Sequence, residues 1–176
     1  MTVRTMRAEE YPPMRAVSVE AFDDADIGTL LDALRESWCW RDELSFVAEL
    51  DGEIVGHVLY TSAIVDAPAA LVDVLVLSPI GVRRDLHGRG IGGRLITETL
   101  PLLRDRPEPV VFLEGSPAYY PRFGFRPGAE LGFVKPSDRI PDPAFQVRPL
   151  GDLPDGLSGR LVYPDAFWRT DSVGLR

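Results

Sequence analysis

The chain has 176 residues, 45% of them hydrophobic, and a formal net charge of −8, which together fit one folded domain with a buried core. The acidic balance argues against a general nucleic-acid binder, because such a protein needs a basic surface to displace the counterions of nucleic acid. The single cysteine, Cys39, excludes an internal disulfide and a zinc site built from several cysteines.

The first half of the chain predicts a strand, two helices and a hairpin. Periodicity places a strand at residues 3–7, a helix at 10–22, a second helix carrying Ile27, Leu30, Leu31 and Leu34, and strands at 45–50 and 53–63. Asp51-Gly52 between the last two strands is typical of a hairpin turn. The start of the chain has no apolar signal region and no apolar run reaches about 18 residues, so we expect a soluble cytoplasmic protein.

The second half predicts further strands around two helices. In a strand at 71–82, Pro79 indicates a sheet edge or a bulge, because proline cannot donate to a ladder. The stripe that follows predicts a helix that Pro101 bends or shortens; it comprises Ile91, Leu95, Ile96, Leu100 and Leu103. Next come a strand at 110–113, a short aromatic helix at 117–123 ending at Gly124, and strands at 145–148 and 160–163 around the turn Asp155-Gly156. This order predicts a mixed α/β sheet covered by helices.

The glycine-rich run between the strand at 71–82 and the following helix is the most informative stretch. It reads Val-Arg-Arg-Asp-Leu-His-Gly-Arg-Gly-Ile-Gly-Gly from Val82 to Gly93. Glycines let backbone amides approach a ligand closely. The start of a helix directs free N–H groups and the positive end of the helix dipole toward that ligand. The sequence therefore predicts a cradle for the pyrophosphate of a cofactor.

Three interpretations of this run compete. The simplest is a plain surface loop. The second is a dinucleotide site, in which Gly88, Gly90 and Gly93 fit G-x-G-x-x-G and Glu114 takes the place of the ribose-binding acid. Against it, five residues separate Val82 from the first glycine, a hairpin precedes the unit, and a proline-rich segment follows it. The third interpretation is a site for the pyrophosphate of coenzyme A (CoA).

Two motifs in the right order carry the third interpretation. The loop matches an Arg/Gln-x-x-Gly-x-Gly/Ala signature at His87, Gly90 and Gly92, with His87 departing from the usual Arg or Gln. Residues 118–125, Ala-Tyr-Tyr-Pro-Arg-Phe-Gly-Phe, match a second signature, in which a tyrosine is followed by three residues and then by Gly-Phe. With these motifs the chain resembles the Gcn-related N-acetyltransferase (GNAT) superfamily, and residues 159–167 are similar to the end of its YhbS-type branch.

The resemblance implies a mixed, mostly antiparallel central sheet with helices on both faces. It implies a single domain over residues 1–176, in which 140–176 form a strand-rich C-terminal extension packed on the rest. It also implies acetyl-CoA as co-substrate without a metal. The cofactor-binding residues would be strand amides and the loop, namely Ile80, Gly81, Val82, His87, Gly88, Arg89, Gly90, Ile91, Gly92 and Gly93.

For catalysis, the resemblance makes Tyr120 the residue that protonates the departing CoA thiolate. Glu114 is the first candidate for the general base, because a partly buried carboxylate at a strand end has a raised pKa. Asp73 is a second candidate, and deprotonation relayed by water without a single base is a third possibility. We expect His57 to pack or hydrogen-bond within the hairpin rather than to contact substrate.

The implied activity is direct transfer of an acetyl group to a primary amine, from a small molecule or a peptide. We expect no nucleic-acid or membrane partner and leave a homodimer open. The acidic side chains Asp23, Asp24, Asp26, Asp32 and Glu36 can attract a cationic amine, with Trp38 or Trp40 beside them, but they also fit a solvated acidic face. The alternative function is a non-catalytic acyl-CoA-binding or regulatory module on the same fold.

Overall fold

The computed structural model of the chain describes residues 1–22 and 24–174. These residues form nine strands in one sheet, in the order β1-β2-β3-β4-β5-β8-β6, with β9 pairing with both β3 and β7. The chain divides into two compact units. Unit 1 comprises Met1–Thr61 and Leu77–Leu102, and unit 2 comprises Ser62–Val76 and the chain from Leu103 onward.

The strands of unit 1 are β1 (Thr2–Thr5), β2 (Ser45–Leu50), most of β3 (Glu53–Asp66) and the second half of β4 (Leu71–Val82). β2 is antiparallel to both β1 and β3. Asp51 and Gly52 both have positive φ, 52° and 83°, which is the backbone that a two-residue turn between twisted strands needs. The hairpin predicted from Asp-Gly is confirmed.

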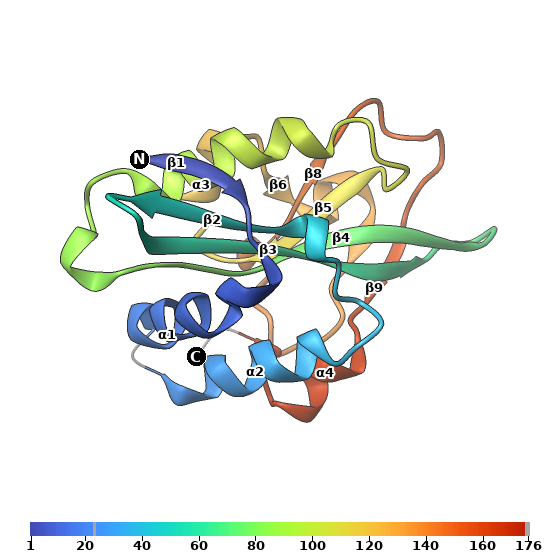
Figure 1. Ribbon diagram of the computed structural model, residues 1–176. Helices are drawn as coiled ribbons and strands as arrows, with labels where there is room; N and C mark the ends of the chain where they lie inside the picture. Colours follow the sequence, from blue (N-terminus) through green and yellow to red (C-terminus); the bar gives the residue numbers. More distant parts are fainter. Residues whose placement is uncertain (23, 175–176) are drawn as a thin grey trace. The chain divides into compact units, whose positions relative to one another are not determined.

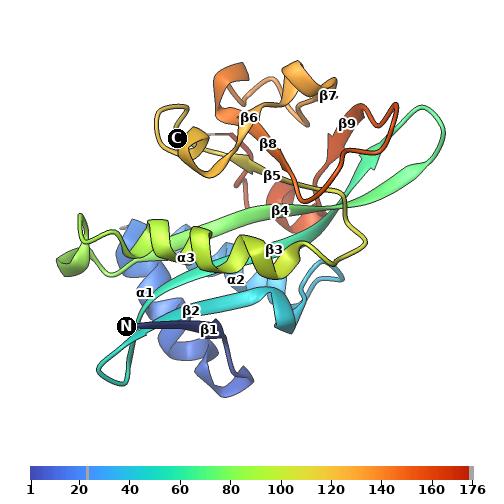
Figure 2. The ribbon, with the colours of Figure 1, turned by 90° about the horizontal axis from the view of Figure 1, so that it is seen from above.

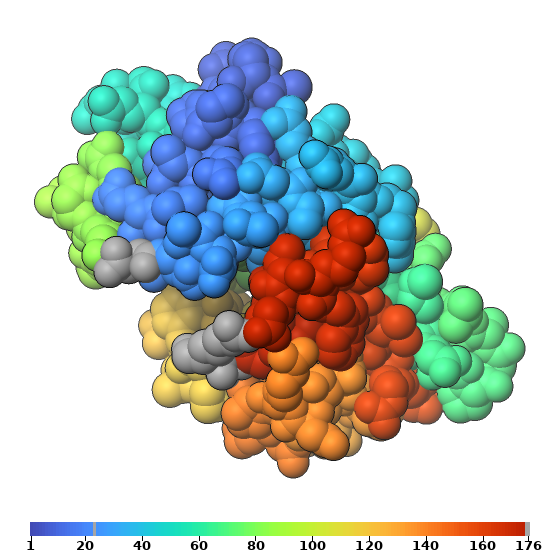
Figure 3. Space-filling model, turned by 90° about the horizontal axis from the view of Figure 1, so that it is seen from below, coloured from blue at the N-terminus to red at the C-terminus, as the bar shows by residue number. Residues whose placement is uncertain are grey.

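Three helices of unit 1 cover the strands of that unit on both faces (Figures 1 and 2). The helices α1 (Tyr11–Phe22) and α2 (Ala25–Arg35) lie on one face, and α3 (Ile91–Thr99) lies on the other. Asp24 begins α2, because its side chain accepts a hydrogen bond from the Asp26 amide at 2.8 Å. Seen from below in Figure 3, α1 and α2 form one continuous surface.

The strands of unit 2 surround β5 (Val110–Glu114). β5 pairs in parallel with β4 at Leu75 and Val76, and antiparallel with β8 (Phe145–Pro149) along its whole length. The short strands β6 (Arg126–Pro127), β7 (Phe133–Val134) and β9 (Gly159–Val162) complete this part of the sheet. The core contains Phe112, whose ring stacks on Phe145 at a centroid distance of 5.5 Å and meets Phe133 edge-on at 5.0 Å.

The remaining helices are short. α4 spans Asp165–Arg169, and the 3-10 helices are η1 (Ala8–Glu10), η2 (Asp42–Leu44), η3 (Arg84–Leu86), η4 (Leu100–Leu103), η5 (Tyr120–Phe123), η6 (Gly128–Leu131) and η7 (Asp142–Ala144). The change from α3 to η4 comes two residues before Pro101, so the predicted shortening is confirmed.

The expected fold class, a mixed and mostly antiparallel sheet with helices, is confirmed. Pro79 lies beyond the part of β4 that pairs with β5, whose register covers Leu75 and Val76, so a local edge or a bulge at Pro79 stays a prediction. Two local predictions need correction. The aromatic helix predicted at 117–123 is a single 3-10 turn from Tyr120 to Phe123. The strand predicted at 3–7 ends earlier, at Thr5, and Arg7 precedes η1.

Candidate functional site

The loop after β4 is folded back onto the end of that strand. The Arg83 N–H donates to the Val55 carbonyl at 2.8 Å, and the His87 ring atom Nε2 lies 2.6 Å from the Val82 carbonyl oxygen. Because a carbonyl oxygen only accepts, Nε2 carries the ring proton in this contact. Leu86 is buried beneath the turn. The loop is therefore a compact turn immediately before α3.

Two glycines give this turn its shape. Gly88 and Gly90 have φ of 76° and 78°, and a Cβ added at either would meet nothing within 4 Å. Gly90 precedes the first residue of α3, and its carbonyl accepts the first helical hydrogen bond, from the Arg94 amide at 3.0 Å. Both glycines thus combine a left-handed backbone with open space above it.

The first three amides of α3 belong to Ile91, Gly92 and Gly93. They precede the first helical hydrogen bond, and they have no backbone acceptor within residues 1–22 and 24–174. Three free N–H groups at the positive end of the helix dipole form an anion site. The glycine loop predicted from sequence therefore has the geometry of a phosphate cradle.

The arginines of the loop differ in their availability. Arg83 is held by Glu53 at 2.9 Å and by Asp85 at 2.8 Å, and Arg94 is held by Glu98 at 2.7 Å. Arg89 is exposed and forms no ion pair with the described residues. It is thus the arginine between the two left-handed glycines that can supply charge to an anion.

The predicted strand contribution lies at the last three residues of β4, Ile80, Gly81 and Val82. Gly81 is buried, and a Cβ there would lie 3.0 Å from the Ala21 Cβ of α1. Close packing of α1 on β4 therefore requires a residue without a side chain at this position. Whether these amides bind a cofactor stays a prediction.

Tyr120 lies in unit 2, at the start of η5. Its ring packs edge-on against Tyr119 at 5.1 Å and Phe125 at 6.0 Å. Burial raises the pKa of Tyr120 to about 12, so the phenol is protonated throughout the neutral range. The hydroxyl has no hydrogen-bond partner among the described residues, which leaves it available to a ligand.

The turn before Tyr120 is held by backbone and side-chain hydrogen bonds. The Ser116 carbonyl accepts from the Tyr119 and Tyr120 amides at 3.1 and 3.3 Å. Gln146 of β8 donates from Nε2 to the Gly115 carbonyl at 3.2 Å and to the Ser116 carbonyl at 3.4 Å. Nothing in the sequence pattern around Gln146 predicted this contact.

Glu114 ends β5, also in unit 2. Burial raises the pKa of its carboxyl group, while a hydrogen bond from the Tyr163 hydroxyl and one from the Gly174 amide oppose that rise. The Gly174 nitrogen lies 3.0 Å from Glu114 Oε2. The expected upward shift is therefore present, and two donors that the sequence reading missed hold the carboxylate.

The other candidates have structural surroundings. His57 is fully buried, its Nε2 lies 3.0 Å from Ser45 Oγ, and desolvation lowers its pKa to about 3. It is a neutral residue of the hairpin, as expected. Asp73 is exposed on β4, which fits a solvated charge.

The acidic side chains near α2 are partly used by the fold. Asp32 accepts from Arg15 at 2.8 Å and from the Tyr11 hydroxyl at 2.7 Å, and Asp24 caps α2. Asp26 and Glu36 are exposed, and Trp38 is 51% exposed. Asp23 lies outside the described residues. Only part of the predicted acidic group is thus free to meet a cationic substrate.

Residues 1–22 and 24–174 contain no group of three or more His, Cys, Asp or Glu side chains that could hold a metal ion. No helix in this part of the chain has the length and apolar character needed to span a membrane.

Comparison with known proteins identifies relatives of both sequence and structure. Residues 2–128 match the family model described as an acetyltransferase (GNAT) domain. An Escherichia coli K12 protein, the uncharacterized N-acetyltransferase YjhQ, is 35% identical over 124 residues, which are 70% of this chain and 68% of that protein.

Two solved structures extend the similarity along the chain. The crystal structure of E. coli YhbS, a GNAT family N-acetyltransferase in complex with CoA, gives a TM-score of 0.85 at 26% identity, covering 96% of this chain and 92% of YhbS. A GNAT family acetyltransferase from Brucella melitensis in complex with acetyl-CoA gives 0.75 at 30% identity, covering 94% and 97%.

Proposed function

Because the chain belongs to the GNAT acetyltransferase family, we propose that it transfers an acetyl group from acetyl-CoA directly to a primary amine. The observation that carries this proposal is the start of α3, where three unpaired amides follow two left-handed glycines. That arrangement suits a pyrophosphate, which needs several N–H donors and close backbone approach.

The co-substrate is acetyl-CoA. The Brucella relative was solved with acetyl-CoA and YhbS with CoA, and the start of α3 in this chain presents backbone amides suited to a pyrophosphate. The amides of Ile91, Gly92 and Gly93 would bind the pyrophosphate oxygens, and Arg89 would add a mobile positive charge. His87 contributes through its hydrogen bond to Val82, which holds the loop, rather than through contact with the phosphate.

Tyr120 acts as the general acid in this proposal. The nitrogen of a neutral amine forms a bond to the acetyl carbonyl carbon, and the carbon–sulfur bond breaks. Tyr120 donates its hydroxyl proton to the departing thiolate. The absence of a hydrogen-bond partner among the described residues supports this role, because the proton of the phenol is uncommitted.

Glu114 is the proposed acceptor of the proton that the amine loses. Burial raises the pKa of its carboxyl group, which makes Glu114 a better proton acceptor than an exposed carboxylate. The Tyr163 hydroxyl and the Gly174 amide would stabilise the ionised form before the proton arrives. The acceptor itself would be an amine of a small molecule or a peptide, attracted by the exposed Asp26 and Glu36.

Calorimetry tests the cofactor assignment. Acetyl-CoA should bind at least about 10-fold more tightly than NAD or FAD, and saturating acetyl-CoA should raise the melting temperature, since a ligand that binds the folded state stabilises it. Equal or tighter binding of a dinucleotide would contradict the assignment.

Turnover requires a separate assay. CoA release should appear with at least one member of a panel of small amines and peptide amines. Tight acetyl-CoA binding without turnover on any amine would favour the non-catalytic regulatory module instead.

A further inference from the structure

Gln146 is a buried polar residue that the proposed mechanism does not use. It lies on β8 with 1% of its surface exposed. Its Nε2 contacts the Gly115 and Ser116 carbonyls, whereas its Oε1 is buried with no hydrogen-bond partner in the described chain. An unpaired buried acceptor destabilises a protein, so the position of Gln146 requires an explanation.

The two carbonyls that Gln146 contacts belong to the turn that carries Tyr120. The Gly115 amide donates to the Ala144 carbonyl of η7 at 3.0 Å, which anchors one end of the turn. The Ser116 carbonyl accepts both the Tyr119 and Tyr120 amides, so it sets where Tyr120 begins its helical turn. Gln146 therefore connects β8 to the backbone that positions Tyr120.

Gly115 connects this backbone to the Tyr120 ring. A Cβ added at Gly115 would overlap Tyr120 Cε2, and it would lie 2.8 Å from Cδ2. The ring thus rests directly on the Gly115 backbone, with no space for even a methyl group. A shift of the Gly115 peptide therefore moves the phenol, because the ring packs against that backbone.

We propose that Gln146 is a positioning residue for Tyr120, fixing the Gly115-Ser116 backbone on which the phenol rests. The proposal rests on the proposed function only in that Tyr120 must be the general acid. Gln146 does not touch the reacting atoms; its N–H groups hold the turn so that the hydroxyl meets the thiolate. Misplacement of a catalytic group by about 1 Å can lower a rate roughly 10²-fold.

The test is a double-mutant cycle of Gln146→Met and Tyr120→Phe at saturating acetyl-CoA. Methionine keeps the volume of glutamine and removes both N–H donors. Gln146→Met should lower kcat about 10- to 100-fold, with KM for acetyl-CoA unchanged. The loss should be smaller with acyl donors whose thiols leave more easily, because those donors need the proton less. In the Tyr120→Phe background, Gln146→Met should have little further effect.

Two further variants complete the design. Gly115→Ala should reproduce the kcat loss and the leaving-group dependence by displacing the ring directly. Thr99→Val, which removes the buried hydrogen bond to the Leu95 carbonyl in unit 1, should lower the melting temperature without changing kcat. If Gln146→Met fails to fold, Gln146→Leu removes the same donors and keeps an apolar side chain of similar volume.

The outcomes separate the two proposals. If Tyr120→Phe alone leaves kcat unchanged, the role of Tyr120 fails and the positioning role fails with it. If Tyr120→Phe lowers kcat but Gln146→Met leaves it at the wild-type value, only the positioning role is overturned. The same holds if the two losses multiply independently.

Discussion

At the scale of single residues, a substitution of Gly90 tests whether the loop binds the phosphate through its backbone or through the His87 side chain. Its φ of 78° and the open space above it indicate that an anion would approach the backbone there. Gly90→Val should weaken acetyl-CoA binding at least ~10-fold, about 1.4 kcal/mol, because a side chain would occupy the space of the phosphate. His87→Ala should lose less, since the imidazole contacts Val82 rather than the ligand. Calorimetry of the two variants checks this order.

Gly52→Val is the matched control for backbone strain. Gly52 has a φ of 83° and equally open surroundings, but it lies in the hairpin turn between β2 and β3. Gly52→Val should lower the melting temperature as Gly90→Val does, and it should leave the dissociation constant for acetyl-CoA unchanged. A His87→Ala variant that binds worst of the three would make the imidazole the phosphate ligand.

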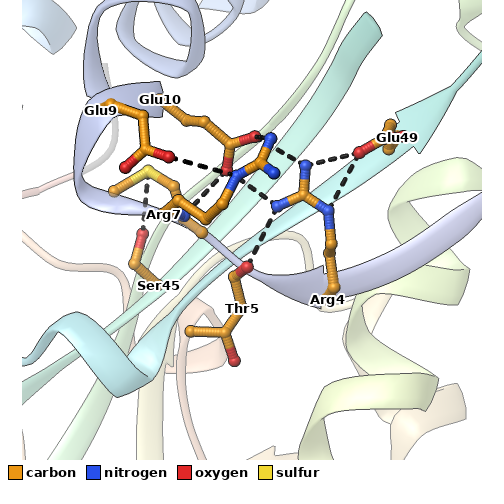
Figure 4. A network of polar contacts seen from close by, with 8 residues as sticks. Arg4, Thr5, Arg7, Glu9, Glu10, Ser45 and Glu49 are labelled. Atoms are coloured by element: carbon orange, nitrogen blue, oxygen red, sulfur yellow. Dashed lines mark hydrogen bonds and ion pairs between the residues drawn. The ribbon is translucent and has the colours of Figure 1, made fainter. Parts of the chain in front are cut away.

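At the scale of elements, an ion network joins β1, η1 and β2 (Figure 4). Arg4 of β1 donates to Glu10 at 2.7 and 2.8 Å and to Glu49 of β2 at 3.0 Å, and the Arg7 amide donates to Glu10 at 2.8 Å. The hydrogen bonds from Arg4, more than those from Arg7, hold the pKa of Glu10 well below its usual range. The side chain of Glu10 is 10% exposed, so solvent screens these contacts little.

Glu10→Gln should reduce the free energy of unfolding by about 1–3 kcal/mol at neutral pH, because Arg4 loses a charged partner in a buried position. A carboxyl group whose pKa is lower in the folded state stabilises the fold above its unfolded pKa of 4.5. The stability difference between Glu10→Gln and wild type should therefore be complete at pH 7 and shrink as the pH falls below 4.5. Denaturant unfolding at several pH values measures it.

Glu9→Gln supplies the comparison within the same turn. Glu9 is 73% exposed and pairs with Arg7 at 3.5 Å, so its removal should change stability by less than about 1 kcal/mol. A loss that is equal for the two variants, or that is independent of pH, would show that the network does not stabilise the N-terminal strand.

At the scale of the whole molecule, local signals account for what the sequence predicted. Asp51-Gly52 sets its own turn, and Pro101 limits the helix that precedes it, α3. The left-handed backbone of Gly88 and Gly90 is likewise a property of these residues. Each of these signals acts over a few neighbouring residues, so it is readable without knowledge of the fold.

The features that sequence reading missed depend on distant partners. Glu114 is held by Tyr163 and Gly174, which are 49 and 60 residues further along the chain by number. Gln146 is buried on β8, and the Gly115 and Ser116 carbonyls that it contacts lie 31 and 30 residues away along the chain. A single domain with an extension at 140–176 stays a prediction.

The most direct measurement is the kcat of Tyr120→Phe for CoA release, with acetyl-CoA and a responsive amine. The substitution removes one hydroxyl and keeps the ring, so folding and acetyl-CoA affinity should be unchanged. If the phenol protonates the thiolate, kcat should fall roughly 10²- to 10⁴-fold. Tyr119→Phe, which changes the neighbouring ring of the same turn, should leave kcat nearly unchanged. Equal kcat for wild type and Tyr120→Phe would contradict the proposed mechanism.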